Sequence, residues 1–530
     1  MDGNRPVVTS LRGMVAAAHP QAAFVGARIL RQGGNAFDAA VATAAALGVV
    51  EPFMSGPAGL GMATYFSRAE AQVGCLDFVP GVPRGFDAST CSKEDIYLGA
   101  RASGIPGNLA GWYALAARYG RLSWADLLTP AIELADEGVP ITQMLPTVTP
   151  EYWELRSSDP EWVRVYANNG RPMPVGWVLR QPDLAQTLSL IASDGPSAFY
   201  EGAFAKRMVR HLASRGGCLS MDDLAAVQPA WLSSVSVDYR GRQVHSLPPP
   251  AEAFQCLITL GILDKVDLAT YSRNGAHHVD AVIRAARLAA EARLSYNQAP
   301  REQVESLLGG DLLAELRRRF NVGEGFHGRA QQWQAVDDPE RLGRREHTTS
   351  LSVGDDEGNL VCITQSLGSI YGSGVVIPGT GICMNNFLNW GDLDPASPNQ
   401  LRPGGRLSMC LAPTVTTQAG EPVLALGTPG SYGILHTQVQ AMAQYFDYGL
   451  PLQQAVEAPR VRLWDGNLVH AESRFDAPVV AELTARGHAV STVAPYTRVV
   501  GGIQAVSRDP ATGTLIGAAD PRRDGYAAAP

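Results

Sequence analysis

The sequence predicts a large α+β protein, in which a mostly helical N-terminal part precedes a C-terminal part rich in strands. Patterns with helical periodicity dominate residues 107–300, whereas residues 349–427 carry short runs of β-branched residues between turns. The helix expected over 36–47 is apolar almost all round. Because such a helix must be covered on every side, we expect it to lie inside a layered structure.

The first 66 residues are expected to form a strand, two helices and a second strand. A short apolar strand is predicted at 14–18. The tripeptide GGN at 33–35 then separates two helical stretches, because glycine readily ends a helix and asparagine caps the next one. The glycine-rich turn at 55–61 leads into a strand over 62–66.

The middle of the chain is predicted to be helical. Ser123 has the hydroxyl of a helix N-cap and precedes one of these segments. A polar, charged stretch over 322–347 has little apolar periodicity, so we expect an exposed connection there. The helices are expected at 112–119, 124–137, 183–192 and 278–296.

The pattern changes abruptly after this connection. Residues 349–353 and 359–366 are predicted to pair as a hairpin, with the turn formed by GDDEG at 354–358. Further strands are expected at 374–377, 412–417 and 423–427. The last third of the chain is therefore predicted to be rich in sheet.

Composition and charge favour a protein that acts on a small molecule. With 45% hydrophobic and 18% charged residues, the 530-residue chain is typical of globular proteins. A net charge of -8 without a basic cluster gives no reason to expect nucleic acid or an anionic membrane as partner. Seven scattered cysteines form no metal-binding spacing, so neither metal nor cofactor is expected. The chain shows no secretory signal pattern and no apolar membrane span, which favours the cytoplasm.

The junction between the helical part and the sheet carries a set of candidate catalytic residues. A threonine that begins a strand is ordinary by itself, because β-branched residues favour strands. Here, however, HTTS at 347–350 is followed by TQS at 364–366, GSG at 372–374 and GTPGS at 427–431. Several separate motifs in a fixed order are hard to obtain by chance.

Together these motifs resemble the γ-glutamyltranspeptidases, a family of N-terminal-nucleophile hydrolases. The resemblance extends from Gly13 to about Phe475 and includes the opening block, GMVAAAHPQAAFVGARILRQGGNAFDAAVATAAALGVVEP. It also includes SGIPGNLAGW, HTTSLSV, GSGVVIPGTGICMNN and GTPG. The family implies a four-layer αββα sandwich that cuts itself between His347 and Thr348. Residues 1–347 and 348–530 would then be two associated subunits of one body, with pairing of two such protomers left open.

The resemblance also implies roles for individual residues. Once Thr348 is an N-terminus, its α-amine, with a pKa of about 7.7–8.0, can serve as general base for its own hydroxyl. Thr364 and Ser366 match hydroxyl residues that orient the nucleophile, although they could instead be two ordinary strand residues. Thr349 is expected to assist the cleavage. Gly430 and Ser431 match the pair whose backbone N–H groups form the oxyanion hole, where a serine is tolerated if its dihedrals allow.

The sequence departs from the family where a glutamyl donor would be held. An arginine is replaced by Val79, and an arginine fork for a carboxylate has no substitute in valine. A pair of serines is replaced by Met409 and Cys410, polar residues by Phe387 and Trp390, and an asparagine by Gly368. These changes, with Tyr371 as a further lining residue, predict a larger, apolar substrate pocket. Alternatively, these residues belong only to the core.

Three functions were weighed from these features. The first is hydrolysis of a C–C bond in a pyrroline-type intermediate, as attributed to family homologues in the biosynthesis of 4-alkylproline antibiotics such as lincomycin and hormaomycin. The second is amide hydrolysis or acyl transfer, as in relatives that resemble cephalosporin acylases. The third is a non-catalytic relative that only binds a ligand or partner. We favour the first function slightly, because the residues that would hold a glutamyl donor are missing and this indicates a changed substrate.

Overall fold

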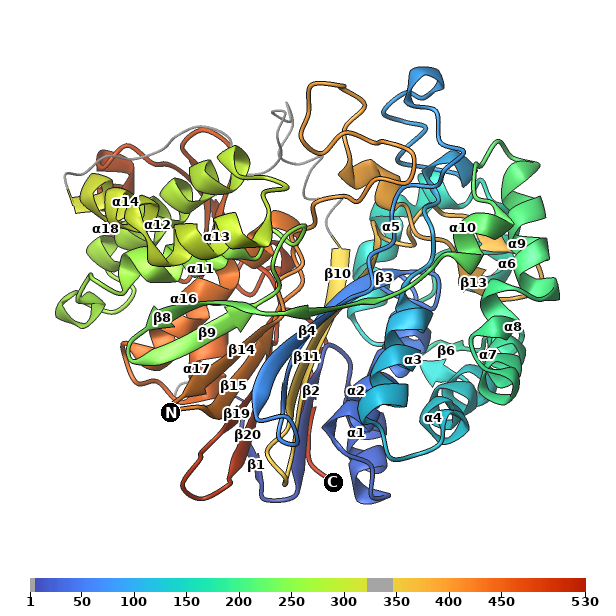
Figure 1. Cartoon of the computed structure of the whole chain (residues 1–530), viewed down its shortest axis with the longest axis horizontal. Coiled ribbons are helices and arrows are strands. Elements are labelled where there is room, and N and C mark those ends of the chain that lie inside the picture. The colour runs from blue at the N-terminus through green and yellow to red at the C-terminus, as the bar shows by residue number, and fades with distance from the viewer. Residues whose placement is uncertain (1–4, 322–346) are drawn as a thin grey trace.

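Two seven-stranded antiparallel sheets lie face to face in the computed structural model, which describes residues 5–321 and 347–530 (Figure 1). The first sheet has the order β21 (Tyr526–Ala528), β2 (Gly13–Ala17), β10 (His347–Asp355), β11 (Leu360–Gly368), β3 (Leu60–Ser67), β4 (Gln72–Asp77) and β7 (Ala230–Ser233). The second has the order β1 (Val8–Ser10), β20 (Leu515–Ala519), β19 (Gln504–Arg508), β15 (Glu421–Gly427), β14 (Thr414–Gln418), β9 (Arg242–Ser246) and β8 (Val235–Tyr239).

Side chains of the first sheet alternate between two hydrophobic cores. Along β2 and β10, Val15, Leu351 and Val353 face the helices of the N-terminal part. Met14 and Cys362, on the opposite face, pack between the two sheets with side chains of the second sheet. Since successive side chains of a strand point to opposite faces, this period of two separates the layers. The predicted four-layer αββα sandwich is confirmed.

Helices cover the outer face of each sheet (Figure 1). The helix α2 is buried along its whole length between the first sheet and other helices, as its apolar sequence predicted. The helices that pack on the first sheet or beside it are α1 (Pro20–Arg31), α2 (Ala36–Val50), α3 (Asn108–Tyr119), α4 (Trp124–Glu137) and α7 (Pro182–Asp194). The second sheet is covered by α11 (Phe254–Leu263), α12 (Ala276–Ser295), α13 (Arg301–Gly309), α14 (Asp311–Asn321), α16 (Ile434–Phe446) and α17 (Leu452–Glu457).

Further helices and short strands lie beside the two helical layers. On the side of the first sheet these are α5 (Met144–Arg156), α6 (Pro160–Tyr166), α8 (Ser197–Tyr200), α9 (Ala203–Ala213) and α10 (Met221–Ala225), with the small pairs β5 (Val139–Pro140) with β6 (Val178–Leu179) and β12 (Val376–Ile377) with β13 (Ile382–Cys383). Near α12 lie α18 (Ala477–Ala485) and the three-stranded sheet of β16 (Val461–Leu463), β17 (Leu468–Glu472) and β18 (Ala489–Val493).

Most predicted elements occur where the sequence placed them. The helix α4 begins after Ser123, whose side chain accepts from the N–H of Asp126. The hairpin of β10 and β11 is also present. Two expectations were wrong. The strands β7, β8 and β9 lie inside the stretch expected to be helical, and they are only four or five residues long. His347, expected in an exposed connection, is fully buried as the first residue of β10, and residues 322–346 lie outside the described ranges.

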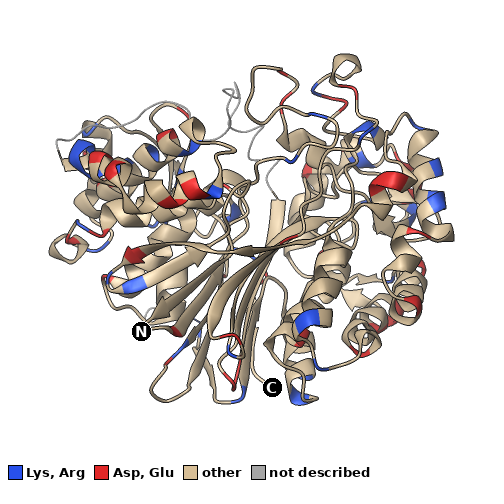
Figure 2. Ribbon diagram, viewed as in Figure 1, with Lys and Arg blue, Asp and Glu red and all other residues tan. Residues whose placement is uncertain are grey.

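Charged residues lie mostly on the outer helices and loops, with both signs interspersed, while the two sheets carry few of them (Figure 2). Among the described helices, none combines the length and the apolar character that crossing a bilayer requires. Within residues 5–321 and 347–530, no group of three or more His, Cys, Asp or Glu side chains has the arrangement of a metal site.

A buried capping box anchors the start of α2. The Asn35 side chain accepts from the N–H groups of Phe37 and Asp38, and the Asp38 carboxylate accepts from the N–H of Asn35 at 3.0 Å. Both Asp38 oxygens also accept from the N–H of Arg121, each at 3.0 Å. One fully buried carboxylate therefore joins α2 to the connection between α3 and α4.

We predict that Asp38→Ala lowers the free energy of unfolding by about 2–4 kcal/mol, because the N–H groups of Asn35 and Arg121 would lose their acceptor. Thermal or denaturant unfolding measures this loss. Asp126→Ala is the matched control, since Asp126 has the same position in α4 but is exposed. An equal loss in both variants would contradict the role assigned to the buried box.

Candidate active site

Thr348 lies at the start of β10, where the chain enters the first sheet from its rim (Figure 1). The pairing of β10 with β11 is irregular here, because His347 pairs with Gly368 whereas Thr349 pairs with Gln365. Two residues of β11 thus stand opposite the single residue Thr348. Such bulges bend a strand and redirect a side chain, and they are frequent next to active sites. Thr348 is 3% exposed in the uncut chain.

The peptide bond before Thr348 is held by the hydroxyl of Ser366. The Ser366 Oγ donates to the carbonyl oxygen of His347 at 2.5 Å. The same Oγ accepts from the N–H of Gly368 at 2.9 Å, which strengthens the hydroxyl as a donor. A donor on this oxygen would stabilise the negative charge that forms when the carbonyl carbon is attacked. The sequence predicted Ser366 in the site, but as a partner of the nucleophile's hydroxyl.

Thr364 lies two residues before Ser366 on β11, and the two side chains therefore point to the same face of the sheet. It pairs with Ser350, and the two hydroxyl oxygens are 3.3 Å apart. Gly427, the last residue of β15, packs directly on this pair, because a Cβ there would lie 2.2 Å from Ser350 Oγ and 3.3 Å from Thr364 Oγ1. The close approach requires glycine and brings the second sheet against the strand of Thr348. The predicted bond from Thr364 to Thr348 stays a prediction.

The turn after Gly427 presents two backbone donors. Gly430 and Ser431 are buried, and their N–H groups donate to no other residue within the described part of the chain. The Gly430 carbonyl points the other way and accepts from Arg462 Nη1 at 2.6 Å. The φ angles are +132° at Gly430 and +53° at Ser431. For serine a left-handed conformation costs about 1–2 kcal/mol, so Ser431 fits less easily than glycine would.

Thr349 points to the opposite face of the sheet, toward the helices. Its Oγ1 donates to Glu51 Oε2 at 2.7 Å, and Glu51 is the residue that follows α2. Burial raises the pKa of Glu51 to about 7, although the Thr349 hydrogen bond and the nearby Arg523 lower it and Asp524 raises it further. A buried acid that titrates near neutral pH thus lies one residue from the predicted cleavage site. Glu51 was not predicted from the sequence, although it stands in the EP pair that ends the opening block.

The His347 side chain is held on the other side of the predicted cleavage site. Its Nε2 is 2.8 Å from the hydroxyl of Tyr152, and the two rings meet edge to face. Tyr152 belongs to α5 and is almost fully buried. The imidazole and the carbonyl of His347 therefore each have a partner, which orients the bond before Thr348. No sequence motif indicated Tyr152, because α5 is far from His347 along the chain.

Five predicted pocket residues gather in one apolar cluster with Tyr432, which follows Gly430 and Ser431. These residues are Val79, Phe387, Trp390, Met409 and Cys410. Tyr371 lies elsewhere, in a cluster with Tyr152, Trp162 and Phe53. Gly368 has a φ of +100°, and a Cβ there would lie 2.3 Å from Asn386 Oδ1. A side chain is therefore excluded at 368, where Asn386 fills the space.

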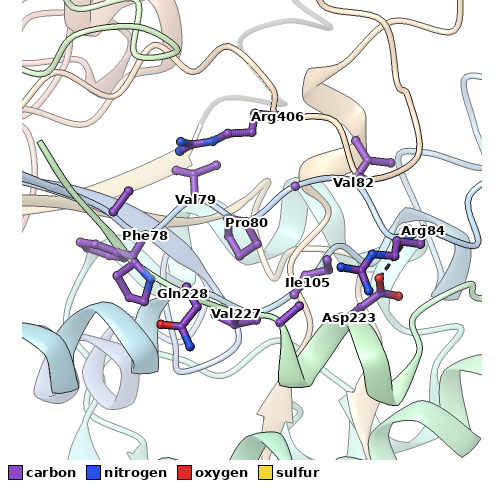
Figure 3. Close-up of a pocket in the computed structure, with 15 residues that line it drawn as sticks. Phe78, Val79, Pro80, Val82, Arg84, Ile105, Asp223, Val227, Gln228 and Arg406 are labelled. Carbon is purple, nitrogen blue, oxygen red and sulfur yellow. Dashed lines mark hydrogen bonds between the residues drawn. The ribbon is translucent and has the colours of Figure 1, made fainter.

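The structure also brings an arginine beside Val79. Arg406 Nη2 forms an ion pair with the carboxylate of Asp77, which is almost fully buried at the end of β4. The N–H of Val79 donates to the same carboxylate at 2.9 Å. A guanidinium thus lies next to the position where the family resemblance led us to expect one (Figure 3), although it comes from a distant segment. Arg406 was not predicted from the sequence, because it lies 329 residues from Asp77 along the chain.

Comparisons with known proteins agree with this geometry. A family model described as gamma-glutamyltranspeptidase matches residues 22–530. The acylase ACY 1 proenzyme of Pseudomonas sp. (strain SE83) is 32% identical over 532 residues, covering 97% of this chain and 93% of the acylase. The crystal structure of cephalosporin acylase from Bacillus halodurans has a TM-score of 0.89 and 31% identity, covering 100% and 98% of the two chains. A structure of LmbA2991 has a TM-score of 0.87 and 26% identity, covering 100% of both.

We predict that Ser366→Ala slows cleavage before Thr348 by about 10²–10³-fold, because the carbonyl of His347 loses a hydrogen-bond donor. The rate is measured from the fraction of cut chain in intact-mass spectra taken over time. Ser366→Thr keeps the hydroxyl and should cut nearly as fast as the wild type. Unchanged cleavage in Ser366→Ala would remove Ser366 from the cleavage machinery.

A second prediction concerns Glu51. Its pKa is raised above the ordinary value, so its neutral form stabilises the fold at low pH, and this stability is lost as the pH rises toward 7. The loss should be on the order of 2–3 kcal/mol. Glu51→Gln stays neutral, so its stability relative to the parent should increase between pH 5 and pH 8. Thermal unfolding of both proteins on a Thr348→Ala background tests this, and a pH-independent difference would contradict it.

Proposed function

Because the chain belongs to the γ-glutamyltranspeptidase family and is an N-terminal threonine hydrolase, we propose that it cuts itself between His347 and Thr348. Residues 1–347 would form the large subunit and residues 348–530, or 530 − 347 = 183 residues, the small one. The two parts would stay associated, since the hairpin of β10 and β11 in the small subunit lies between β2 and β3 of the large subunit in the first sheet.

The proposed cleavage begins with attack by Thr348 Oγ on the carbonyl carbon of His347. The C–N bond breaks, the nitrogen takes a proton and becomes the α-amine of Thr348, and the acyl group moves to the hydroxyl oxygen as an ester. Water then hydrolyses the ester to leave a carboxylate on His347. The contact that carries this proposal is the hydrogen bond from the Ser366 hydroxyl to the His347 carbonyl oxygen.

In turnover, the freed α-amine of Thr348 would take the proton of the neighbouring hydroxyl, which then attacks an acyl-type carbon of the substrate. The N–H groups of Gly430 and Ser431 would donate to the oxyanion. Their lack of other acceptors among the described residues supports this role. Hydrolysis of the resulting ester completes the cycle.

For the substrate, we favour a pyrroline-type keto compound whose C–C bond is hydrolysed. Attack by Thr348 on the keto carbon would form an acyl ester, while the electron pair of the broken C–C bond moves into the conjugated pyrroline, which then takes a proton. The apolar wall of Val79, Phe387, Trp390 and Met409 supports a substrate that is less polar than a glutamyl donor. Such a wall, with a few polar groups, is typical of small-molecule sites.

Amide hydrolysis is the second candidate, and the similarity to two proteins named as acylases favours it. The same nucleophile and oxyanion donors would serve both reactions. The difference lies in the leaving group, which is an amine in one and a stabilised carbanion in the other. Supplying purified enzyme with a pyrroline keto acid and with acyl amides, and identifying products by NMR, separates the two candidates.

Intact mass under denaturing conditions tests the self-cleavage itself. We expect the wild type to give two fragments that divide after His347, and Thr348→Ala to give one uncut chain. Thr348→Ser is the matched control, since it keeps a hydroxyl and should still cut. A wild type that remains one chain after long incubation would exclude the mechanism, and cutting of Thr348→Ala would assign the nucleophile elsewhere.

A further inference from the structure

Arg462, on the short strand β16, reaches the turn that carries the two proposed oxyanion donors. Its side chain is fully buried, and its Nη1 donates to the carbonyl oxygen of Gly430 at 2.6 Å. The N–H of Gly433 donates to the same oxygen at 2.9 Å. Because a carbonyl oxygen has two lone pairs, both acceptor positions of Gly430 are occupied, and one of the two donors is a cation.

The carbonyl of Gly430 belongs to the same peptide unit as the N–H of Ser431. Since a peptide unit is planar and trans, its C=O and its N–H point in opposite directions. Two donors that hold the oxygen on one side therefore fix the direction of the N–H on the other side. A positive charge at the oxygen also polarises the peptide, and hydrogen bonds linked in this way strengthen one another. The Ser431 N–H thereby becomes a stronger donor to a negatively charged oxygen.

The backbone conformation of Ser431 makes this peptide sensitive to such contacts. Its φ is +53°, a left-handed value that serine adopts less readily than glycine. If the peptide plane rotated until its C=O and N–H exchanged directions, Ser431 would reach an ordinary negative φ. Gly430, at a φ of +132°, can accommodate either arrangement. That rotation would direct a carbonyl oxygen to the place where the oxyanion donor now points.

The guanidinium of Arg462 is itself held in place by its surroundings. It lies over the indole of Trp464, with its Cζ 4.7 Å from the ring centroid. A Cβ at Gly433 would lie 1.9 Å from Nη1, so the guanidinium occupies the space that a side chain would need. His436 of α16 fixes the strand next to it, because its Nε2 accepts from the N–H of Leu463 at 3.2 Å. The donor to Gly430 is therefore positioned before any substrate arrives.

We infer that Arg462 is a positioning residue of the oxyanion hole. It holds the peptide between Gly430 and Ser431 in the orientation that presents the Ser431 N–H to the reacting oxygen, and it strengthens that N–H as a donor. The inference rests on the proposed function for the role of this N–H. It also supplies the physical reason why a serine in a left-handed conformation is tolerated at position 431.

Two reactions of the chain separate this role from a general effect on folding. In the proposed self-cleavage the Ser366 hydroxyl holds the His347 carbonyl, so Arg462 variants should still cut themselves. Turnover needs the Ser431 N–H, so it should slow. The probe for turnover is p-nitrophenyl butyrate. Thr348 Oγ would form a butyryl ester as p-nitrophenolate leaves, and water would then release butyrate and restore the hydroxyl. Thr348→Ala gives the background hydrolysis.

Arg462→Met should cut itself like the wild type but release p-nitrophenolate about tenfold more slowly at saturation, since losing an oxyanion donor entirely costs about 10²–10³-fold. The probe concentration for half-saturation should change little, because the donor acts in the transition state. Arg462→Lys keeps a cation and should recover much of the rate. Arg287→Met is the matched control with the wild-type rate, because Arg287 is equally buried but donates to the carbonyls of Trp464 and Leu468.

A second comparison tests the orientation of the peptide directly. Glycine at position 431 adopts the left-handed conformation without strain, so Arg462→Met should cost about threefold instead of about tenfold in a Ser431→Gly background. Ser431→Ala is the matched background, because alanine disfavours a positive φ as serine does. There the loss of Arg462 should cost as much as in the wild type. A residue that served only the fold would show no such dependence on position 431.

The outcomes distinguish this inference from the proposed function. A wild type that never cuts itself would remove both. If the wild type cuts, equal rates in Arg462→Met and Arg287→Met, or an equal loss in the two Ser431 backgrounds, would overturn the inference alone. If Arg462→Met does not fold, Gly433→Ala decides, because its backbone suits alanine while the new Cβ would displace the guanidinium. It should slow p-nitrophenolate release, and a wild-type rate would overturn the inference.

Discussion

The pairing of β10 with β11 is the constraint on which the site depends. It sets Ser366 against the carbonyl of His347 and Thr364 against Ser350, and its irregularity leaves Thr348 alone opposite two residues. Because a shift of one residue would turn every side chain to the other face of the sheet, the hydrophobic alternation of β10 fixes which hydroxyls of the hairpin share one face. The second sheet then adds its turn only because Gly427 allows close contact.

The site also contains groups that cost stability. Glu51 is buried with a raised pKa, and Ser431 adopts a left-handed conformation that glycine would take more easily. Stable folds accept such costs where the surrounding structure holds them in place. Here Glu51 accepts a hydrogen bond from Thr349, which follows the bond that the proposed chemistry cuts, and Ser431 lies in the turn that this chemistry uses. The buried carboxylate of Asp38, in contrast, accepts from the N–H groups of Asn35 and Arg121 and serves the fold.

The region of the predicted pocket differs from the family pattern in its apolar residues and in the origin of its arginine. Val79, Phe387, Trp390, Met409 and Cys410, where the family pattern has polar residues, lie in one buried apolar cluster. Val79 stands where the family pattern has an arginine, so this position carries no positive charge. A guanidinium is still present nearby, because Arg406 forms an ion pair with Asp77, two residues before Val79.

From the sequence alone, local periodicity and turn residues predicted the hairpin and the caps of α2 and α4, while the resemblance of contiguous motifs to the family implied the four layers and the candidate nucleophile. It did not reveal the short strands β7 and β9, which pair with the distant strands β4 and β14, or β8, which forms a hairpin with its neighbour β9. Only the tertiary structure decided the contacts of His347 with Tyr152, Thr349 with Glu51 and Asp77 with Arg406, which are 195, 298 and 329 residues apart. Contacts of this kind arise when packed layers bring remote segments together, and no local pattern encodes them.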